Sequence, residues 1–125
     1  MRCEKYFSDP LFKGCISINY PDAYECFLDE IVLFLRNHNS LNGINNLITI
    51  SQVKMKFDVF TVYVTSNDDN YKIPKNVYDE LRIIQKKAFN YCKHCGKKKT
   101  EMVIDTTIRK VCFDHFPTRA NSYGK

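Results

Sequence analysis

"LITISQVKMKFDVFTVYVTS", residues 47–66, contains two runs rich in β-branched and aromatic residues, separated by Asp58. Such runs favour strands, and aspartate tolerates the left-handed backbone of a tight turn. The stretch therefore predicts an antiparallel β-hairpin that turns at Asp58. In the second run alternate residues form one apolar face, which comprises Phe60, Val62 and Val64.

The alternation of the first run changes phase once. Ile48 and Ile50 share one parity, whereas Val53 and Met55 have the other. One extra residue inserted into a strand produces this change, because side chains point to opposite faces at successive positions. We therefore expect a β-bulge near residues 51–52.

Helical periodicity flanks the hairpin on both sides. Residues 20–39 place apolar side chains three and four positions apart, with Pro21 in the first turn and His38 near the C-terminal end of the helix dipole. The polar stretch 37–46 then predicts a loop. Residues 75–91 have a one-face apolar stripe. Together these patterns predict an α+β fold, a small antiparallel sheet packed by two helices. The stripe consists of Val77, Leu81, Ile84, Ala88 and Tyr91.

The last quarter of the chain contains two pairs of metal-ligand residues. Two residues separate Cys92 from Cys95, two separate Cys112 from His115, and the 16-residue gap between the pairs contains the β-prone stretch 101–111. Each pair offers two ligands from one tight turn, and a β-hairpin in the gap brings the pairs together. Gly96 suits the positive φ of such a knuckle. Thiolates and an imidazole select zinc over hard cations. We expect a structural Zn²⁺ site in a zinc-ribbon-like end.

A redox cysteine pair and a catalytic zinc are the alternatives. A thioredoxin-like C-x-x-C lies between a strand and a helix, whereas here a helix precedes the motif and lysines follow it. Four protein ligands close the coordination sphere, and neither the zinc-deaminase signature nor H-E-x-x-H is present. We expect His94 to lie outside the site and Asp114 to be a surface residue rather than a general base. No catalytic residue and no enzymatic activity are predicted.

A chain of 125 residues is long enough for one compact domain with its own core. We expect an α+β core over residues 1–91, a zinc-ribbon-like extension packed on it over 92–116, and a basic tail over 117–125. No apolar run is long enough for a membrane helix, and the N-terminus lacks the apolar region of a secretory signal, so a cytoplasmic protein is expected. The remaining cysteines are expected to be small core residues; they are Cys3, Cys15 and Cys26.

The net charge of +5 is concentrated in the C-terminal quarter. Residues 1–91 hold 11 Lys and Arg and 11 Asp and Glu, whereas residues 92–125 hold 8 and 3. Such an excess fits an acidic partner such as a phosphate backbone, or a solvated face without a partner. The candidate nucleic-acid contacts are Lys97, Lys98, Lys99, Arg109 and Lys110.

The stretches "ISQVKMKFDVFTVYV", "YDELRIIQKKAFNYCKHCG" and "VCFDHF" resemble a group of small, largely uncharacterised bacterial and phage proteins. In that group a strand reading roughly V-x-Q-V-K-E-K-F-G precedes a short aromatic strand, a long helix leads into C-x-x-C-G, and the chain ends in C-x-x-H. The resemblance covers roughly residues 10–116 and implies the fold and the metal ligands, but no established activity. Met55 and Asp58 depart from the acidic residue and the glycine of the group, so the surface at this turn differs.

Two functions fit these features. The first is a protein-binding module of the immunity or inhibitor type, favoured by small size, a rigid metal-bound end and many aromatic residues, which anchor interfaces well. The alternative is a nucleic-acid-binding regulatory protein that uses the basic ribbon, for which charge alone predicts weak and salt-sensitive binding. The interface expected for a protein partner consists of Phe57, Asp58, Tyr63 and Tyr71.

Overall fold

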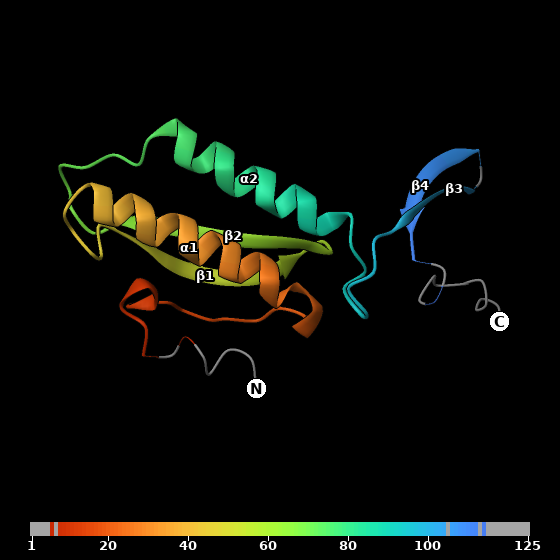
Figure 1. The fold of residues 1–125 in the computed structure, drawn as a ribbon, viewed down its shortest axis with the longest axis horizontal. Helices are drawn as coiled ribbons and strands as arrows, with labels where there is room; N and C mark the ends of the chain where they lie inside the picture. Colours follow the sequence, from red (N-terminus) through yellow and green to blue (C-terminus); the bar gives the residue numbers. More distant parts are fainter. Residues whose placement is uncertain (1–5, 7, 105, 113, 115–125) are drawn as a thin grey trace.

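The computed structural model describes residue 6 and residues 8–104, 106–112 and 114. Within these residues, α1 and α2 lie side by side over one face of the hairpin β1–β2, and β3–β4 extends beyond the turn of that hairpin (Figure 1). The predicted α+β fold, with two helices packed on a small antiparallel sheet, is confirmed. The elements in chain order are η2 (Pro10–Phe12), η3 (Asp22–Tyr24), α1 (Glu25–Leu41), β1 (Ile48–Lys56), β2 (Val59–Ser66), α2 (Lys75–Phe89), β3 (Thr100–Ile104) and β4 (Thr107–Val111).

The hairpin β1–β2 has the predicted bulge. The antiparallel register shifts between Ile50 and Gln52. This shift explains why Ile50 and Val53, which differ in parity, are both fully buried. The connection is a two-residue turn in which Phe57 and Asp58 have φ of 52° and 65°, so the left-handed backbone expected at Asp58 is confirmed and extends to its neighbour.

Helix α1 begins and ends later than predicted. Pro21 precedes the short 3₁₀ turn η3 in extended backbone, and the α-helix begins only at Glu25. The helix then continues through residues 37–41, which were expected to form a loop. The buried Asn39 explains the difference, because its Nδ2 donates to the backbone oxygen of Ile48 at 3.0 Å and its Oδ1 accepts from the same residue's N–H at 3.1 Å. These tertiary hydrogen bonds offset the low helix propensity of asparagine.

The segment before α1 pairs with β1, which its irregular sequence did not indicate. The N–H of Val53 donates to the oxygen of Ser17 at 3.0 Å, and the N–H of Asn19 donates to the oxygen of Val53 at 2.9 Å. Ile18 thereby forms a parallel bridge with Val53. Within the described residues, this segment thus occupies the side of β1 that β2 does not.

The prediction that the isolated cysteines are core residues is wrong for Cys26, which is exposed. It precedes Phe27, and at about 100° per residue it lies outside the buried stripe of α1. Cys15 is half-buried against the core, and Cys3 lies outside the described residues.

The core is one cluster formed by both helices, the inner face of β1–β2 and the N-terminal segment. The predicted stripe of α2 is confirmed over Val77, Leu81, Ile84 and Ala88, which are buried, while Tyr91 lies beyond the helix and is half-buried. Along the part of the chain that the structure describes, no helix combines the length and apolar content needed to cross a membrane.

Candidate metal centre

Three cysteines from separate positions in the C-terminal quarter meet in one cluster. The Sγ atoms of Cys92, Cys95 and Cys112 all lie within 4.8 Å of one another. The sulfurs of Cys95 and Cys112 are 3.7 Å apart, whereas a disulfide would place them about 2.05 Å apart. Two thiolates bound at about 2.3 Å to a tetrahedral zinc ion would lie about 3.8 Å apart. The three side chains can therefore hold a metal ion.

A tight turn directly after α2 brings the first two sulfurs together. The N–H of Cys92 donates to the oxygen of Lys97 at 2.8 Å, and the N–H of Gly96 donates to the oxygen of Cys92 at 2.8 Å. The N–H of His94 also donates to Sγ of Cys92 at 3.3 Å. Gly96 has φ of +80°, as the knuckle pattern predicted. We call residues 92–97 the knuckle.

The knuckle contacts the start of α1. The hydroxyl of Tyr24 donates to the backbone oxygen of Tyr91 at 2.7 Å. A Cβ placed on Gly96 would lie 3.7 Å from Cβ of Ala23, so the knuckle backbone passes close to η3. The N–H of Lys99 donates to the backbone oxygen of Asn90 at 2.7 Å, which closes the loop at its base. The position of the cluster is thus set by the core.

The thiols of the cluster are electrostatically unequal. Burial alone would raise the pKa of Cys92, but hydrogen bonds from the backbone of His94 and Cys95 and from the thiols of Cys95 and Cys112 lower that pKa to about 7. The backbone of Lys97 acts to lower the pKa of Cys95, yet desolvation and the hydrogen bonds with the other two thiols raise it. Near neutral pH the thiolate fraction of Cys92 is therefore larger than that of an ordinary cysteine, and thiolate is the form that coordinates a soft metal.

Three further residues lie close in sequence to the cluster, namely His94, Asp114 and His115. His115, the predicted fourth ligand, lies outside the described residues. His94 is exposed and does not belong to the three-cysteine cluster. Asp114 is exposed, and its Oδ2 accepts from Nζ of Lys97 at 2.8 Å. This ion pair joins the knuckle to the segment after Cys112, a surface role that agrees with the expectation for Asp114.

The candidate nucleic-acid contacts are only partly open to a ligand. Besides Lys97, Lys110 is engaged, because its Nζ donates to Oδ1 of Asn90 at 2.9 Å. Nζ of Lys99 lies 4.6 Å from the centroid of the Phe89 ring. Lys98 and Arg109 are exposed. Arg109 and Lys110 are successive residues of β4 and point to opposite faces, so the structure does not bring all five onto one surface.

The candidate protein interface is divided between the two ends of β1–β2. Phe57 is 90% exposed at the turn, and Oδ1 of its neighbour Asp58 accepts from Nζ of Lys93 at 2.6 Å. Tyr63 lies part-way along the face that does not contact the helices, since it stands between the buried Val62 and Val64, which is half-buried against the core. Tyr71 lies near the opposite end and is half-buried, with its hydroxyl 2.7 Å from Nε2 of His38. Lys93 is a contact that the sequence did not indicate.

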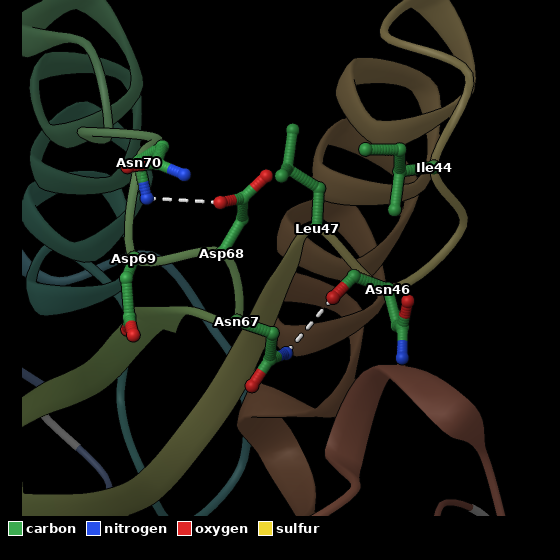
Figure 2. A pocket seen from close by; sticks show the side chains of 7 residues that line it. All are labelled: Ile44, Asn46, Leu47, Asn67, Asp68, Asp69 and Asn70. Carbon is green, nitrogen blue, oxygen red and sulfur yellow. Dashed lines mark hydrogen bonds between the residues drawn. The ribbon is translucent and has the colours of Figure 1, made fainter.

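A hollow of about 430 Å³ lies between the loop after α1 and the loop after β2 (Figure 2), at the end of the sheet away from the knuckle (Figure 1). There Nδ2 of Asn67 donates to the oxygen of Asn46 at 2.8 Å, and Oδ1 of Asp68 accepts from the N–H of Asn70 at 2.9 Å. The first bond connects the loop after α1 with the loop after β2, and the second lies within the loop after β2. The hollow is lined by Ile44, Asn46, Leu47, Asn67, Asp68, Asp69 and Asn70.

No protein-family model matches this chain, and neither the curated proteins nor the solved structures contain a match. The resemblance to small bacterial and phage proteins therefore stays a prediction. The candidate site rests on the geometry of the three cysteines and on the surface beside them.

Proposed function

We propose that this chain is a non-enzymatic binding module, stabilised by a structural zinc ion, that binds a protein partner of the immunity or inhibitor type. The ligands would be Cys92, Cys95 and Cys112, with His115 as the fourth. The observation that carries the proposal is a cluster of three thiols, one pair of which has the spacing of a tetrahedral site, close to a turn with a strongly exposed aromatic residue. When bound, zinc supplies a cross-link between the knuckle and the end of β4.

The need for such a cross-link follows from the β3–β4 hairpin. Its cross-strand pair Val103 and Ile108 is exposed by 69% and 68%, so this pair adds little to a core. An isolated two-stranded hairpin is marginally stable in water. Metal-binding free energy is commonly folding free energy in small metal-bound segments. A structural role for the ion explains how a hairpin with so little burial is retained.

The side chains around Phe57 indicate the chemistry that a protein partner would need in order to bind there. Neither β1 nor β2 contains an acidic residue, and Lys56 precedes Phe57. Asp58 follows it but is paired with Lys93. An exposed phenyl ring among cationic side chains is complementary to an apolar pocket rimmed by carboxylates. Aromatic anchors of this kind dominate binding energy when a partner buries them.

Affinity purification of the zinc-loaded chain from its host tests this proposal. We expect one stoichiometric partner, with affinity at least about 30-fold weaker for Phe57→Ala, as for a hot-spot residue. The matched control is Leu41→Ala, which removes a side chain that is 81% exposed at the C-terminal end of α1. Absence of a protein partner, or equal affinity for Phe57→Ala and the native chain, would contradict the proposal.

The nucleic-acid alternative depends on the basic C-terminal quarter. Three of its expected phosphate contacts, Lys97, Lys99 and Lys110, already have intramolecular partners. Binding a phosphate backbone would require these intramolecular contacts to be exchanged for contacts with phosphates, which lowers the net gain in binding free energy. We therefore place this function second.

A further inference from the structure

The turn between β1 and β2 has an unfavourable backbone for its sequence. Phe57 and Asp58 both have positive φ, at 52° and 65°. Two-residue hairpin turns of this kind are normally occupied by asparagine, aspartate and glycine. A bulky aromatic residue is uncommon in this region, and the 90% exposure of Phe57 means that packing does not offset the strain. Another contact must therefore help to hold the turn.

The contact is supplied by the knuckle. Nζ of Lys93 donates to Oδ1 of Asp58 at 2.6 Å. This hydrogen bond, together with the charge of Lys93, holds the pKa of Asp58 below its usual range, and the nearby charges of Lys99 and His94 act in the same direction. Charged groups of the C-terminal quarter thus lie close to Asp58 in the turn.

The position of Lys93 depends on the cysteine cluster. It follows Cys92, whose backbone N–H and oxygen are both engaged within the knuckle and whose sulfur accepts from the N–H of His94. The knuckle is also held on the core by the Tyr24 hydroxyl and by its close approach to Ala23. Any event that disorders the knuckle therefore removes the ammonium group from Asp58.

We propose that metal binding by the three cysteines orders the β1–β2 turn through the ion pair between Lys93 and Asp58, so that Phe57 is presented in a defined position only in the metal-loaded chain. The biological meaning of this coupling rests on the proposed protein-binding function. The coupling itself is a property of the isolated chain and is measured without any partner.

The test is amide hydrogen exchange, followed by NMR, in the full zinc-loaded chain before and after addition of a zinc chelator. In the native chain we expect chelation to accelerate exchange at Phe57, Asp58 and Val59 by about two- to fivefold, the range that an exposed ion pair supports. The amides of the buried core residues Val62 and Ile84 should keep their protection.

Three variants distinguish an effect of the ion pair between Lys93 and Asp58 from a general loosening of the fold. Lys93→Ala should retain zinc affinity, show fast turn exchange with zinc present, and respond little to chelation. Lys93→Arg should restore the native response. Lys98→Ala, which removes an equal charge from an exposed lysine of the same segment, should behave like the native chain.

Three results would overturn the coupling. The first is a chain that binds no zinc. The second is turn exchange that is unchanged by chelation while Gly96 loses protection. The third is exchange that rises equally at turn and core amides. If chelation accelerates exchange at the turn as expected but the chain binds no protein partner, the proposed function is refuted and the coupling stands.

Discussion

Single residues determine how the knuckle is seated, and Gly96 is the clearest case. Its φ of +80° suits glycine, and Ala23 lies close to where a side chain would begin. Gly96→Ala should cost about 1–2 kcal/mol because an L-residue is strained in the left-handed region. We therefore expect zinc affinity to fall by about 5- to 30-fold in competition with a chromophoric chelator. Gly14→Ala is the matched control, since Gly14 has φ of +82° in the N-terminal segment, and it should leave zinc affinity unchanged.

Tyr24 connects the same knuckle to the core, and its pKa predicts how the stability of the fold changes with pH. Burial, with the nearby negative charges of Cys92 and Asp58, raises the pKa of Tyr24 to about 12, against about 10 in an unfolded chain. Between pH 10 and 12 the unfolded state has lost a proton that the folded state keeps, so raising the pH favours unfolding.

Tyr24→Phe should therefore change stability in a pH-dependent manner. Near pH 7 we expect a loss of about 1 kcal/mol, because the carbonyl of Tyr91 loses its donor. The difference in unfolding free energy between the native chain and the variant should narrow from pH 10 to 12, as measured by urea unfolding. A constant difference across that range would show that the phenol does not carry this dependence.

At the scale of elements, the β3–β4 hairpin and the helical core differ in what stabilises them. The core has a continuous buried cluster, whereas the hairpin exposes Val103 and Ile108. Removal of zinc should therefore abolish the hydrogen-exchange protection of residues 92–112 and leave residues 20–90 folded. Heat unfolding measured by calorimetry should therefore differ between the zinc-loaded and the zinc-free chain.

Cysteine variants provide the control for this prediction. Cys112→Ser should reproduce the effect of chelation, because it removes one ligand of the cluster. Cys26→Ser should change neither metal binding nor heat unfolding, since that thiol is exposed on α1. Unchanged heat unfolding after zinc removal would refute a structural role for the metal.

At the scale of the whole molecule, a measurement of DNA binding tests which of the two proposed functions the charge distribution supports. With a net charge of +5 and several lysines already paired, we expect binding to random duplex or single-stranded DNA to vanish above low salt. A fluorescence anisotropy series from about 0.02 to 0.3 M salt measures this. Micromolar affinity near 0.15 M salt with a steep logarithmic slope would instead support the nucleic-acid function.

Charge-matched variants show which residues account for any DNA binding. Replacing Lys97, Lys98 and Lys99 with alanine should abolish the low-salt binding. Replacing Lys13, Lys72 and Lys86 removes the same charge from the core region and should affect it much less. Equal losses in both variants would indicate a response to net charge alone.

The sequence by itself indicated both helices, the strands of the main hairpin and the cysteine pair of the knuckle. Both strands, the bulge, the stripe of α2 and the positive φ at Gly96 follow from patterns within a few residues, because alternation, helical period and backbone preference are local properties. The pairing of cysteines two residues apart is equally local, and the β-prone gap indicated that Cys112 would join them.

Only the tertiary structure decided which distant segments meet. Tyr24 bonds to Tyr91, Lys93 pairs with Asp58, and Asn39 holds α1 beyond its predicted end. The division of the candidate interface has the same origin, since Phe57 adjoins the residue that pairs with the knuckle and Tyr71 contacts His38 of α1. Each of these contacts depends on how helices pack on the sheet, and packing joins residues whose sequence separation carries no periodic signal. For this reason the sequence predicts a metal site, while the link between that site and an exposed aromatic surface emerges only from the fold.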